Sequence, residues 1–136
     1  MIGVDIVSNE RIRKAIEKFG ERFLKRIYTP LEIEYCKKQV DWIACLSARW
    51  AGKEAVLKAV YQSKGIVLKF SEIEILGDFG KPAKVRLLRE ELKDIQVLIS
   101  LSHEKEYSVA ISIIITNTSG EKLPPYLRLP EKATSL

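Results

Sequence analysis

Two carboxylates stand where the sequence pattern predicts apolar side chains. Asp5 lies in the middle of the alternating segment Ile-Gly-Val-Asp-Ile-Val at residues 2–7, which is typical of a short strand. Glu54 lies four residues after Trp50 and seven before Tyr61, so helical periodicity places it inside an apolar stripe. That predicted stripe consists of Ile43, Leu46, Trp50, Leu57 and Tyr61. A carboxylate among apolar residues needs a partner or nearby water, although an ordinary half-exposed strand face explains Asp5 equally well.

Three bases accompany Glu54 on the same predicted helix. Lys58 follows Glu54 by one turn, and Arg49 and Lys53 occupy an adjoining face. One acid among three bases suits a divalent cation that binds phosphates, with the bases neutralising the remaining negative charge. The structural alternative is a routine exposed Glu–Lys pair, worth about 0.2–0.5 kcal/mol. The position of Glu54 among apolar residues favours the functional interpretation.

His103 is the only histidine of the chain. It follows a predicted strand and begins the short loop 103–106, and strand-end loops often carry binding residues. The segment Gly80-Lys81-Pro82 belongs to a predicted turn at 77–82 and is a weak candidate for a ligand contact. No spacing indicates a Ser/His/Asp arrangement, and the glycines match neither a dinucleotide-binding motif nor a P-loop.

The composition predicts one domain with an anionic partner. The chain has 136 residues, of which 46% are hydrophobic and 30% are charged, which suits a single core and excludes a collagen-like, disordered or multidomain protein. The formal net charge is +5, and residues 11–26 hold seven bases and two acids, so this segment alone accounts for the surplus. The seven bases are Arg11, Arg13, Lys14, Lys18, Arg22, Lys25 and Arg26.

Neither the N-terminus nor the rest of the chain suggests a membrane. No window approaches the roughly 18 apolar residues of a membrane span, and the N-terminal residues lack the basic and apolar regions of a signal peptide. We therefore expect a cytoplasmic protein without a membrane partner. Cys36 and Cys45 are expected to be reduced, structural cysteines, because two thiols form neither a disulfide framework nor a zinc cluster.

The elements that must position these residues can be predicted from local signals. Ser8 or Asn9 can cap a first helix, in which Ile12, Ala15, Ile16 and Phe19 form the inward stripe. Thr29-Pro30-Leu31-Glu32 is typical of a helix start with a capping box. A long helix is predicted over residues 42–62. Strands are predicted over residues 2–7, 72–76, 83–88, 97–102 and 107–116.

This order predicts an α+β fold, in which an N-terminal strand and helices are followed by a mostly antiparallel sheet. We expect one domain over residues 1–116. Residues 117–136 hold three of the five prolines and little periodicity, which predicts an extended C-terminal tail.

Several motifs occur in an order that resembles holo-[acyl-carrier-protein] synthases, the short bacterial type of 4′-phosphopantetheinyl transferase. They are Gly3-Val4-Asp5-Ile6-Val7, Arg11-Ile12, Arg22-Phe23 through Thr29-x-x-Glu32, Ala48-Arg49-Trp50-Ala51-Gly52-Lys53-Glu54-Ala55-x-x-Lys58-Ala59, Gly80-Lys81-Pro82 and Ser102-His103-x-x-x-Tyr107-x-x-Ala110. The resemblance covers about residues 2–115. It implies the 4′-phosphopantetheinyl transferase fold and transfer of the phosphopantetheine arm of coenzyme A to a serine of apo acyl carrier protein. It further implies release of adenosine 3′,5′-bisphosphate and a place in fatty acid biosynthesis.

The resemblance also implies roles for individual residues. Asp5 and Glu54 would bind Mg²⁺, Glu54 or a water molecule that it polarises would be the base, and Lys58 would neutralise phosphate charge. Substrate contacts would come from Arg49 and His103 at the 3′-phosphate of coenzyme A, from Lys53, and from Gly80, Lys81 and Pro82 near the adenine. The resemblance finally implies a homotrimer with active sites between subunits.

The basic segment is expected to dock the carrier protein, because acyl carrier proteins are similar to one another in being acidic. The docking candidates are Arg11, Lys14, Arg22 and Arg26. Two rival interpretations are a small nucleic-acid-binding protein, which the positive charge would favour, and a non-catalytic interaction module in which Glu54 and Lys58 only stabilise a helix. The predicted strands lack the set of aromatic residues that stacks bases, and the basic segment contains two acids, which argues against nucleic acid.

Overall fold

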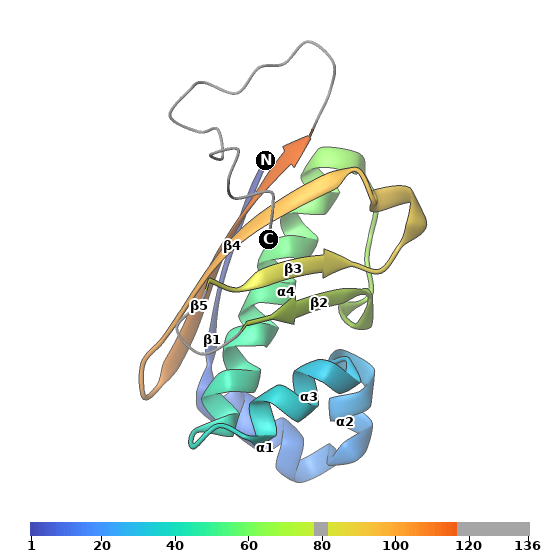
Figure 1. The fold of residues 1–136 in the computed structure, drawn as a ribbon. Coiled ribbons are helices and arrows are strands. Elements are labelled where there is room, and N and C mark those ends of the chain that lie inside the picture. Colours follow the sequence, from blue (N-terminus) through green and yellow to red (C-terminus); the bar gives the residue numbers. More distant parts are fainter. Residues whose placement is uncertain (78–81, 117–136) are drawn as a thin grey trace.

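A 23-residue helix, α4 (Trp42–Lys64), forms the axis of the fold, and both sheets pack against it (Figure 1). The computed structural model describes residues 1–77 and 82–116. The predicted tail at 117–136 and the turn residues Gly80 and Lys81 lie outside the described residues. None of the helices in the described part of the chain has the length and hydropathy needed to cross a membrane.

The elements alternate little between helix and strand, as the predicted α+β class requires. In chain order they are β1 (Ile2–Ser8), α1 (Asn9–Phe19), α2 (Glu21–Ile27), α3 (Pro30–Lys37), α4, the 3₁₀ turn η1 (Phe70–Glu72), β2 (Ile73–Leu76), β3 (Lys84–Leu87), the 3₁₀ turn η2 (Glu90–Leu92), β4 (Ile95–His103) and β5 (Tyr107–Thr116). Strands β1, β5 and β4 form one antiparallel sheet with β5 in the centre, and β2 and β3 form a separate hairpin. The predicted fold class is confirmed.

The helix starts follow the predicted capping chemistry. The Ser8 hydroxyl accepts a hydrogen bond from the Arg11 amide at the start of α1. At the start of α3, the Thr29 hydroxyl accepts from the Glu32 amide and the Glu32 carboxylate accepts from the Thr29 amide. These bonds satisfy amide groups that have no partner inside the helix. Gly20 separates α1 from α2 with a φ of 58°.

The apolar stripe predicted on α4 is only partly correct. Leu46 is fully buried, but Tyr61 is 57% exposed. Many of the buried residues of α4 are small, namely Ala44, Ala48, Ala51, Gly52, Ala55 and Ala59. A stripe predicted from large apolar residues at helical spacing does not include these small residues. Close packing of a sheet on a helix selects small side chains. The predicted inward position of Phe19 is also wrong, since its side chain is 54% exposed.

Strand β1 approaches α4 unusually closely at Gly3. A Cβ atom at this position would overlap the main-chain carbonyl oxygen of Ala55. The residues of β1 that share this face are Gly3, Asp5 and Val7, whereas Ile2, Val4 and Ile6 point to the other side of the sheet and are exposed. The predicted alternation is therefore confirmed, and it directs Asp5 toward the middle of α4.

Candidate functional site

Asp5 contacts Lys58 where β1 crosses α4, and Glu54 lies close enough to feel the charge of both. The ammonium of Lys58 lies 3.3 Å from a carboxylate oxygen of Asp5 and 3.2 Å from the main-chain oxygen of Val4. The Asp5 side chain is 18% exposed, Lys58 is half exposed and Glu54 is half-buried. The three residues are 53 positions apart in sequence at the widest, so the fold creates a small polar centre at the edge of the helix.

The environment of Glu54 disfavours its negative charge. Burial raises the pKa of this carboxyl above its usual range, and the nearby carboxylate of Asp5 raises it further. Lys58 and Arg11 act in the opposite direction but do not cancel the effect. Two carboxylates that repel one another create a demand for additional positive charge between them.

This donor set fits a hard divalent cation that is completed by phosphate and water. Mg²⁺ prefers one or two carboxylates together with phosphate oxygens and waters over a cage of protein ligands. Residues 1–77 and 82–116 contain no group of three or more His, Cys, Asp and Glu side chains arranged to hold a metal. A structural zinc site of the Cys/His type is therefore a poor fit for this centre, whereas a cation shared with a substrate phosphate is a good one.

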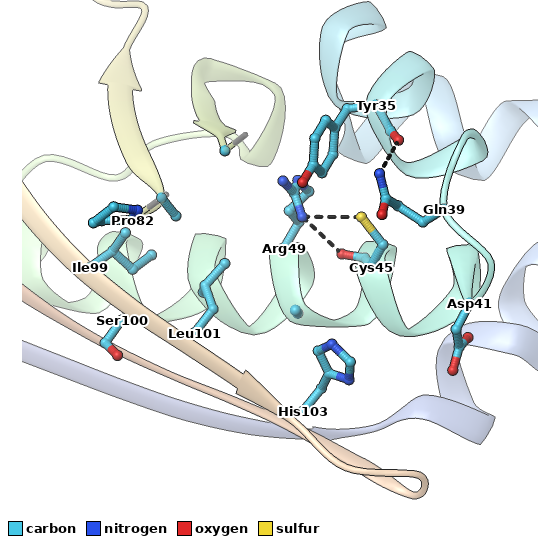
Figure 2. Close-up of a pocket in the computed structure, with 13 residues that line it drawn as sticks. Tyr35, Gln39, Asp41, Cys45, Arg49, Pro82, Ile99, Ser100, Leu101 and His103 are labelled. Atoms are coloured by element: carbon cyan, nitrogen blue, oxygen red, sulfur yellow. Dashed lines mark hydrogen bonds between the residues drawn. The ribbon is translucent and has the colours of Figure 1, made fainter. Parts of the chain in front are cut away.

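A cleft of about 520 Å³ lies on another side of α4 and contains three of the predicted substrate residues. Figure 2 shows Arg49, His103 and Pro82 on its walls, which are contributed by α4, by the end of β4 and by the segment before β3. Tyr35 of α3 and Leu101 of β4 complete the surroundings. The tertiary structure thus brings together residues that lie far apart in sequence, from Tyr35 to His103.

Arg49 is held rigidly at the base of this cleft although it is only 5% exposed. Its Nε donates to the Ile75 carbonyl at 3.1 Å, one terminal nitrogen donates to the Cys45 carbonyl at 3.4 Å, and the guanidinium lies 4.7 Å from the centre of the Tyr35 ring. Burial lowers the pKa of Arg49 from its usual value, but a guanidinium remains protonated in proteins. A fixed, partly desolvated cation of this kind is suited to bind a phosphate.

Tyr35 was not identified from the sequence. No motif or periodicity marks it, because its contact with Arg49 depends on the packing of α3 against α4. An aromatic face on a guanidinium restricts the orientation of the cation. We therefore count Tyr35 among the residues that shape the cleft.

The expectation of reduced cysteines is wrong. Cys36 of α3 and Cys45 of α4 form a disulfide, with their Cα atoms 5.4 Å apart. The short connection between the two helices folds back, so a separation of nine residues in sequence becomes direct contact. The sulfur of Cys45 also accepts a hydrogen bond from Arg49 at 3.2 Å. The bridge therefore lies beside the cleft.

Lys53 lies outside the cleft in a fully enclosed position. Its ammonium lies 2.7 Å from a carboxylate oxygen of Glu32 and donates to the main-chain oxygens of Phe70, at 2.9 Å, and Ile73. The other Glu32 oxygen accepts from the Ile75 amide at 2.9 Å. Because all donors of the ammonium are directed into the protein, this placement argues against the predicted substrate contact and assigns Lys53 a structural role.

The predicted docking residues lie on α1 and α2, which are adjacent at one end of the molecule (Figure 1). Arg11, Lys14, Arg22 and Arg26 are all exposed. By contrast, the neighbouring Arg13 forms ion pairs with Glu10 and Glu17. The structure thus leaves a positively charged surface on these two helices, which we call the basic surface.

Comparison with known proteins identifies relatives over most of the chain. The profile of the 4′-phosphopantetheinyl transferase superfamily matches residues 1–112. A holo-[acyl-carrier-protein] synthase of Aquifex aeolicus is 58% identical over 118 residues, which span 84% of this chain and 97% of the relative. A holo-[acyl-carrier-protein] synthase of Chlamydia trachomatis is 42% identical over 114 residues, spanning 82% of this chain and 96% of the relative.

Solved structures give the same result. The holo-[acyl-carrier-protein] synthase of Helicobacter pylori in complex with coenzyme A matches with a TM-score of 0.71 and 33% identity, covering 85% of this chain and all of that one. The synthase of Neisseria meningitidis matches with a TM-score of 0.74 and 31% identity, covering 85% of this chain and 97% of that one.

Removing the negative charge of Glu54 is predicted to stabilise the folded protein, because burial and the carboxylate of Asp5 disfavour that charge. Because the pKa of Glu54 is raised in the folded protein, the folded state disfavours the ionised carboxylate at neutral pH. The penalty disappears at about pH 3.5, below the unfolded pKa, where the group is protonated in both states. Glu54→Gln should therefore raise the melting temperature at pH 7 in the absence of divalent cations, and this gain should shrink toward zero at about pH 3.5. Thermal unfolding at the two pH values measures it.

The matched control is Glu34→Gln, which neutralises an exposed carboxylate on α3. It should change the melting temperature little at either pH. A gain for Glu54→Gln that is equally large at both pH values would contradict the electrostatic explanation.

Proposed function

The chain belongs to the 4′-phosphopantetheinyl transferase superfamily, and from this premise we propose that it is a holo-[acyl-carrier-protein] synthase. It transfers the 4′-phosphopantetheine arm of coenzyme A to a serine of apo acyl carrier protein and releases adenosine 3′,5′-bisphosphate. The holo-proteins so formed would serve fatty acid biosynthesis. The observation that carries this proposal is the contact of Asp5 with Lys58 close to Glu54, together with a cleft on another side of α4 that contains Arg49 and His103.

Asp5 and Glu54 are the residues that would hold Mg²⁺ together with the pyrophosphate of coenzyme A. The cation would supply positive charge to the pyrophosphate oxygens as the P–O bond between the pantetheine-bearing phosphorus and the bridging oxygen is broken. Two half-buried carboxylates that repel one another favour such a ligand. Lys58 lies beside Asp5 and would neutralise charge on the same phosphates.

Glu54 would also promote attack by the serine hydroxyl, either directly or through a water molecule that it polarises. A general base works best when its pKa lies close to the working pH. In the metal-free protein, burial and the neighbouring Asp5 raise the pKa of Glu54 in that direction, whereas a bound cation would lower it. The serine oxygen then forms a bond to the phosphorus that carries the pantetheine, and the adenosine bisphosphate leaves.

The cleft would bind the nucleotide end of coenzyme A. Arg49 and His103 would provide hydrogen-bond donors for the 3′-phosphate, and Pro82 also lines the cleft. The resemblance implies that Gly80, Lys81 and Pro82 would contact the adenine. Arg49 is the principal anion ligand in this scheme because its guanidinium is already oriented by Ile75, Cys45 and Tyr35.

The direct test is mass spectrometry of apo acyl carrier protein after incubation with this protein, coenzyme A and Mg²⁺. The carrier should gain the mass of one phosphopantetheine group. Asp5→Ala and Glu54→Ala should each lower the initial rate by about a hundredfold or more, because each removes a ligand at the charge-neutralising centre. An unmodified carrier in the presence of well-folded proteins would refute the proposed function, and near-normal rates for both variants at limiting Mg²⁺ would refute the metal assignment.

The 3′-phosphate assignment predicts substrate discrimination. Arg49→Ala and His103→Ala should reduce kcat/KM for coenzyme A by about tenfold or more, the scale of a lost hydrogen bond to a charged group. The same variants should affect dephospho-coenzyme A much less, because it lacks the phosphate. Steady-state kinetics with both substrates measures the ratio, and equal losses with both would remove the assignment.

We also propose that the basic surface docks the acidic carrier protein. Charges at the edge of an interface chiefly steer association. Lys14→Glu and Arg22→Glu should therefore raise KM for the carrier severalfold, leave KM for coenzyme A nearly unchanged, and reduce the sensitivity of carrier binding to salt. Lys93→Glu is the matched control. Lys93 is an exposed base just before the start of β4, whereas His103 is at the other end of that strand. Carrier affinity that is insensitive to these reversals and to salt would place docking elsewhere.

The outer face of the large sheet supports the proposed homotrimer. Its exposed side chains are Ile2, Val4 and Ile6 of β1 and Tyr107, Val109, Ile111 and Ile113 of β5, which the strand register places side by side. A continuous apolar surface of this kind is typical of an interface.

Sedimentation velocity should give the mass of a trimer, and Ile111→Lys should shift the measured mass toward that of the monomer. Val67→Lys, at an exposed apolar residue away from the sheet, should not. A monomeric wild-type protein would contradict the proposal.

A further inference from the structure

Asn9 is a buried polar residue that the proposed reaction does not use. Asn9 is the first residue of α1 and is only 6% exposed. The helix cap itself is provided by Ser8, not by Asn9. The carboxamide of Asn9 is therefore free to serve another part of the molecule, and its hydrogen bonds are made to the connection between β4 and β5 and to the start of β5.

Four hydrogen bonds join Asn9 to this connection and to the start of β5. The side-chain nitrogen donates to the main-chain oxygens of Glu104 at 2.9 Å and Lys105 at 3.2 Å. The side-chain oxygen accepts from the hydroxyl of Ser108 at 2.7 Å. The main-chain amide of Asn9 donates to the Glu106 oxygen at 2.8 Å. Such a set uses both donors and an acceptor of one carboxamide, which no other side chain can reproduce in the same space.

The bonded residues immediately surround His103. Glu104 follows it in the chain, and Ser108 is its partner across the β4–β5 ladder. The hairpin is closed by a hydrogen bond from the Glu104 amide to the Tyr107 oxygen at 2.8 Å. Because His103 is exposed and no packed side chains fix it from all sides, its position in the cleft depends on this short turn. Figure 2 shows the His103 ring at the cleft wall next to α4.

Asn9 also follows β1, the strand that carries Asp5 four residues earlier. Its hydrogen bonds therefore connect the chain segment of the carboxylate centre with the hairpin of the nucleotide cleft. Loops of this kind are otherwise among the more easily opened parts of a protein. The amide of Asn9 restrains this one at its base.

From this geometry we propose that Asn9 is a positioning residue. It holds the β4–β5 hairpin so that His103 faces the cleft, and it thereby increases the preference for nucleotides with a 3′-phosphate. The proposal rests on the proposed function only for the identity of the ligand, since the restraint of the hairpin is a property of the protein alone.

Two variants test the proposal against one control. Asn9→Ala removes all side-chain bonds. Asn9→Asp keeps the size of the side chain and the acceptor for Ser108. It replaces the donor nitrogen with an oxygen, which would face the carbonyl oxygens of Glu104 and Lys105 and repel them. The control Ser8→Ala removes the side-chain cap of the same helix and keeps the main-chain pairing of this residue with Tyr107, so it reports a general loss of stability.

The first measurement uses the ligand-free protein. Amide hydrogen exchange at Glu104 and Ser108 should be faster in both Asn9 variants by about tenfold or more, on the scale of a lost buried hydrogen bond. Exchange at Ile113, farther along β5, should change less. Ser8→Ala should not show this local difference. Equal acceleration along the whole of β5 would mean a merely global loss of stability and would overturn the proposal.

The second measurement compares adenosine 3′,5′-bisphosphate with adenosine 5′-phosphate by isothermal titration calorimetry. The preference of the wild-type protein for the bisphosphate should fall by about tenfold or less in the Asn9 variants, because one of two phosphate ligands is misplaced. In a His103→Ala background, Asn9→Ala should cause no further loss of preference. An unchanged preference in the single variants, or the same loss in Ser8→Ala, would overturn the proposal.

The two measurements separate this inference from the proposed function. If the carrier protein is not modified but hairpin exchange and nucleotide preference respond as described, the transferase proposal fails and the role of Asn9 holds. If transfer occurs while neither property depends on Asn9, the role of Asn9 is refuted and the transferase proposal is unaffected.

Discussion

The close packing of β1 on α4 is the constraint on which the candidate site depends. Gly3 permits it, because the main chain of Ala55 occupies the space of a side chain at that position. Two residues farther along the same face of β1, Asp5 reaches the ammonium of Lys58. A larger separation between strand and helix would leave the two carboxylates as isolated surface groups. The small residues of α4 extend the same close packing along the sheet.

Helix α4 separates two kinds of charge chemistry. At its edge beside β1 it presents Glu54 and Lys58 in a partly open setting, where a carboxylate with a raised pKa can exchange protons and attract a cation. Toward α3 and β2 it encloses Arg49 and Lys53. Arg49 retains an opening into the cleft, whereas Lys53 is neutralised by Glu32 inside the protein. Two bases four residues apart on one helix thus have different roles, because burial decides which charge a ligand can reach.

The buried pair of Glu32 and Lys53 is connected to the cleft through the elements that it joins. Glu32 completes the capping box of α3 and also accepts from the Ile75 amide of β2, and Ile75 in turn supplies the carbonyl that orients Arg49. Removing one member of such a pair leaves an uncompensated charge and is strongly destabilising. Together with the Cys36–Cys45 bridge, this network keeps α3, α4 and β2 in fixed positions around the anion-binding arginine.

Much of the fold and part of the site could be predicted from the sequence because the signals were local. Alternation identified β1, the capping residues identified α1 and α3, and the bounds predicted for the last strand agree with β5. The polar positions of Asp5 and Glu54 within apolar patterns correctly suggested that they lie in partly enclosed surroundings. Local signals depend on residues a few positions apart, and these interactions are present in any chain with that sequence.

Only the tertiary structure decided which of the charged residues are available and what holds them. Lys53 and Arg49 have equivalent signals in the sequence, but the approach of α3 encloses the first and leaves the second at the cleft. The contact of Tyr35 with Arg49, the Cys36–Cys45 bridge and the hydrogen bonds of Asn9 join segments whose proximity no periodicity records. Desolvation, ion pairing and hydrogen-bond geometry depend on distances in space, and these are determined when helices and sheets pack against one another.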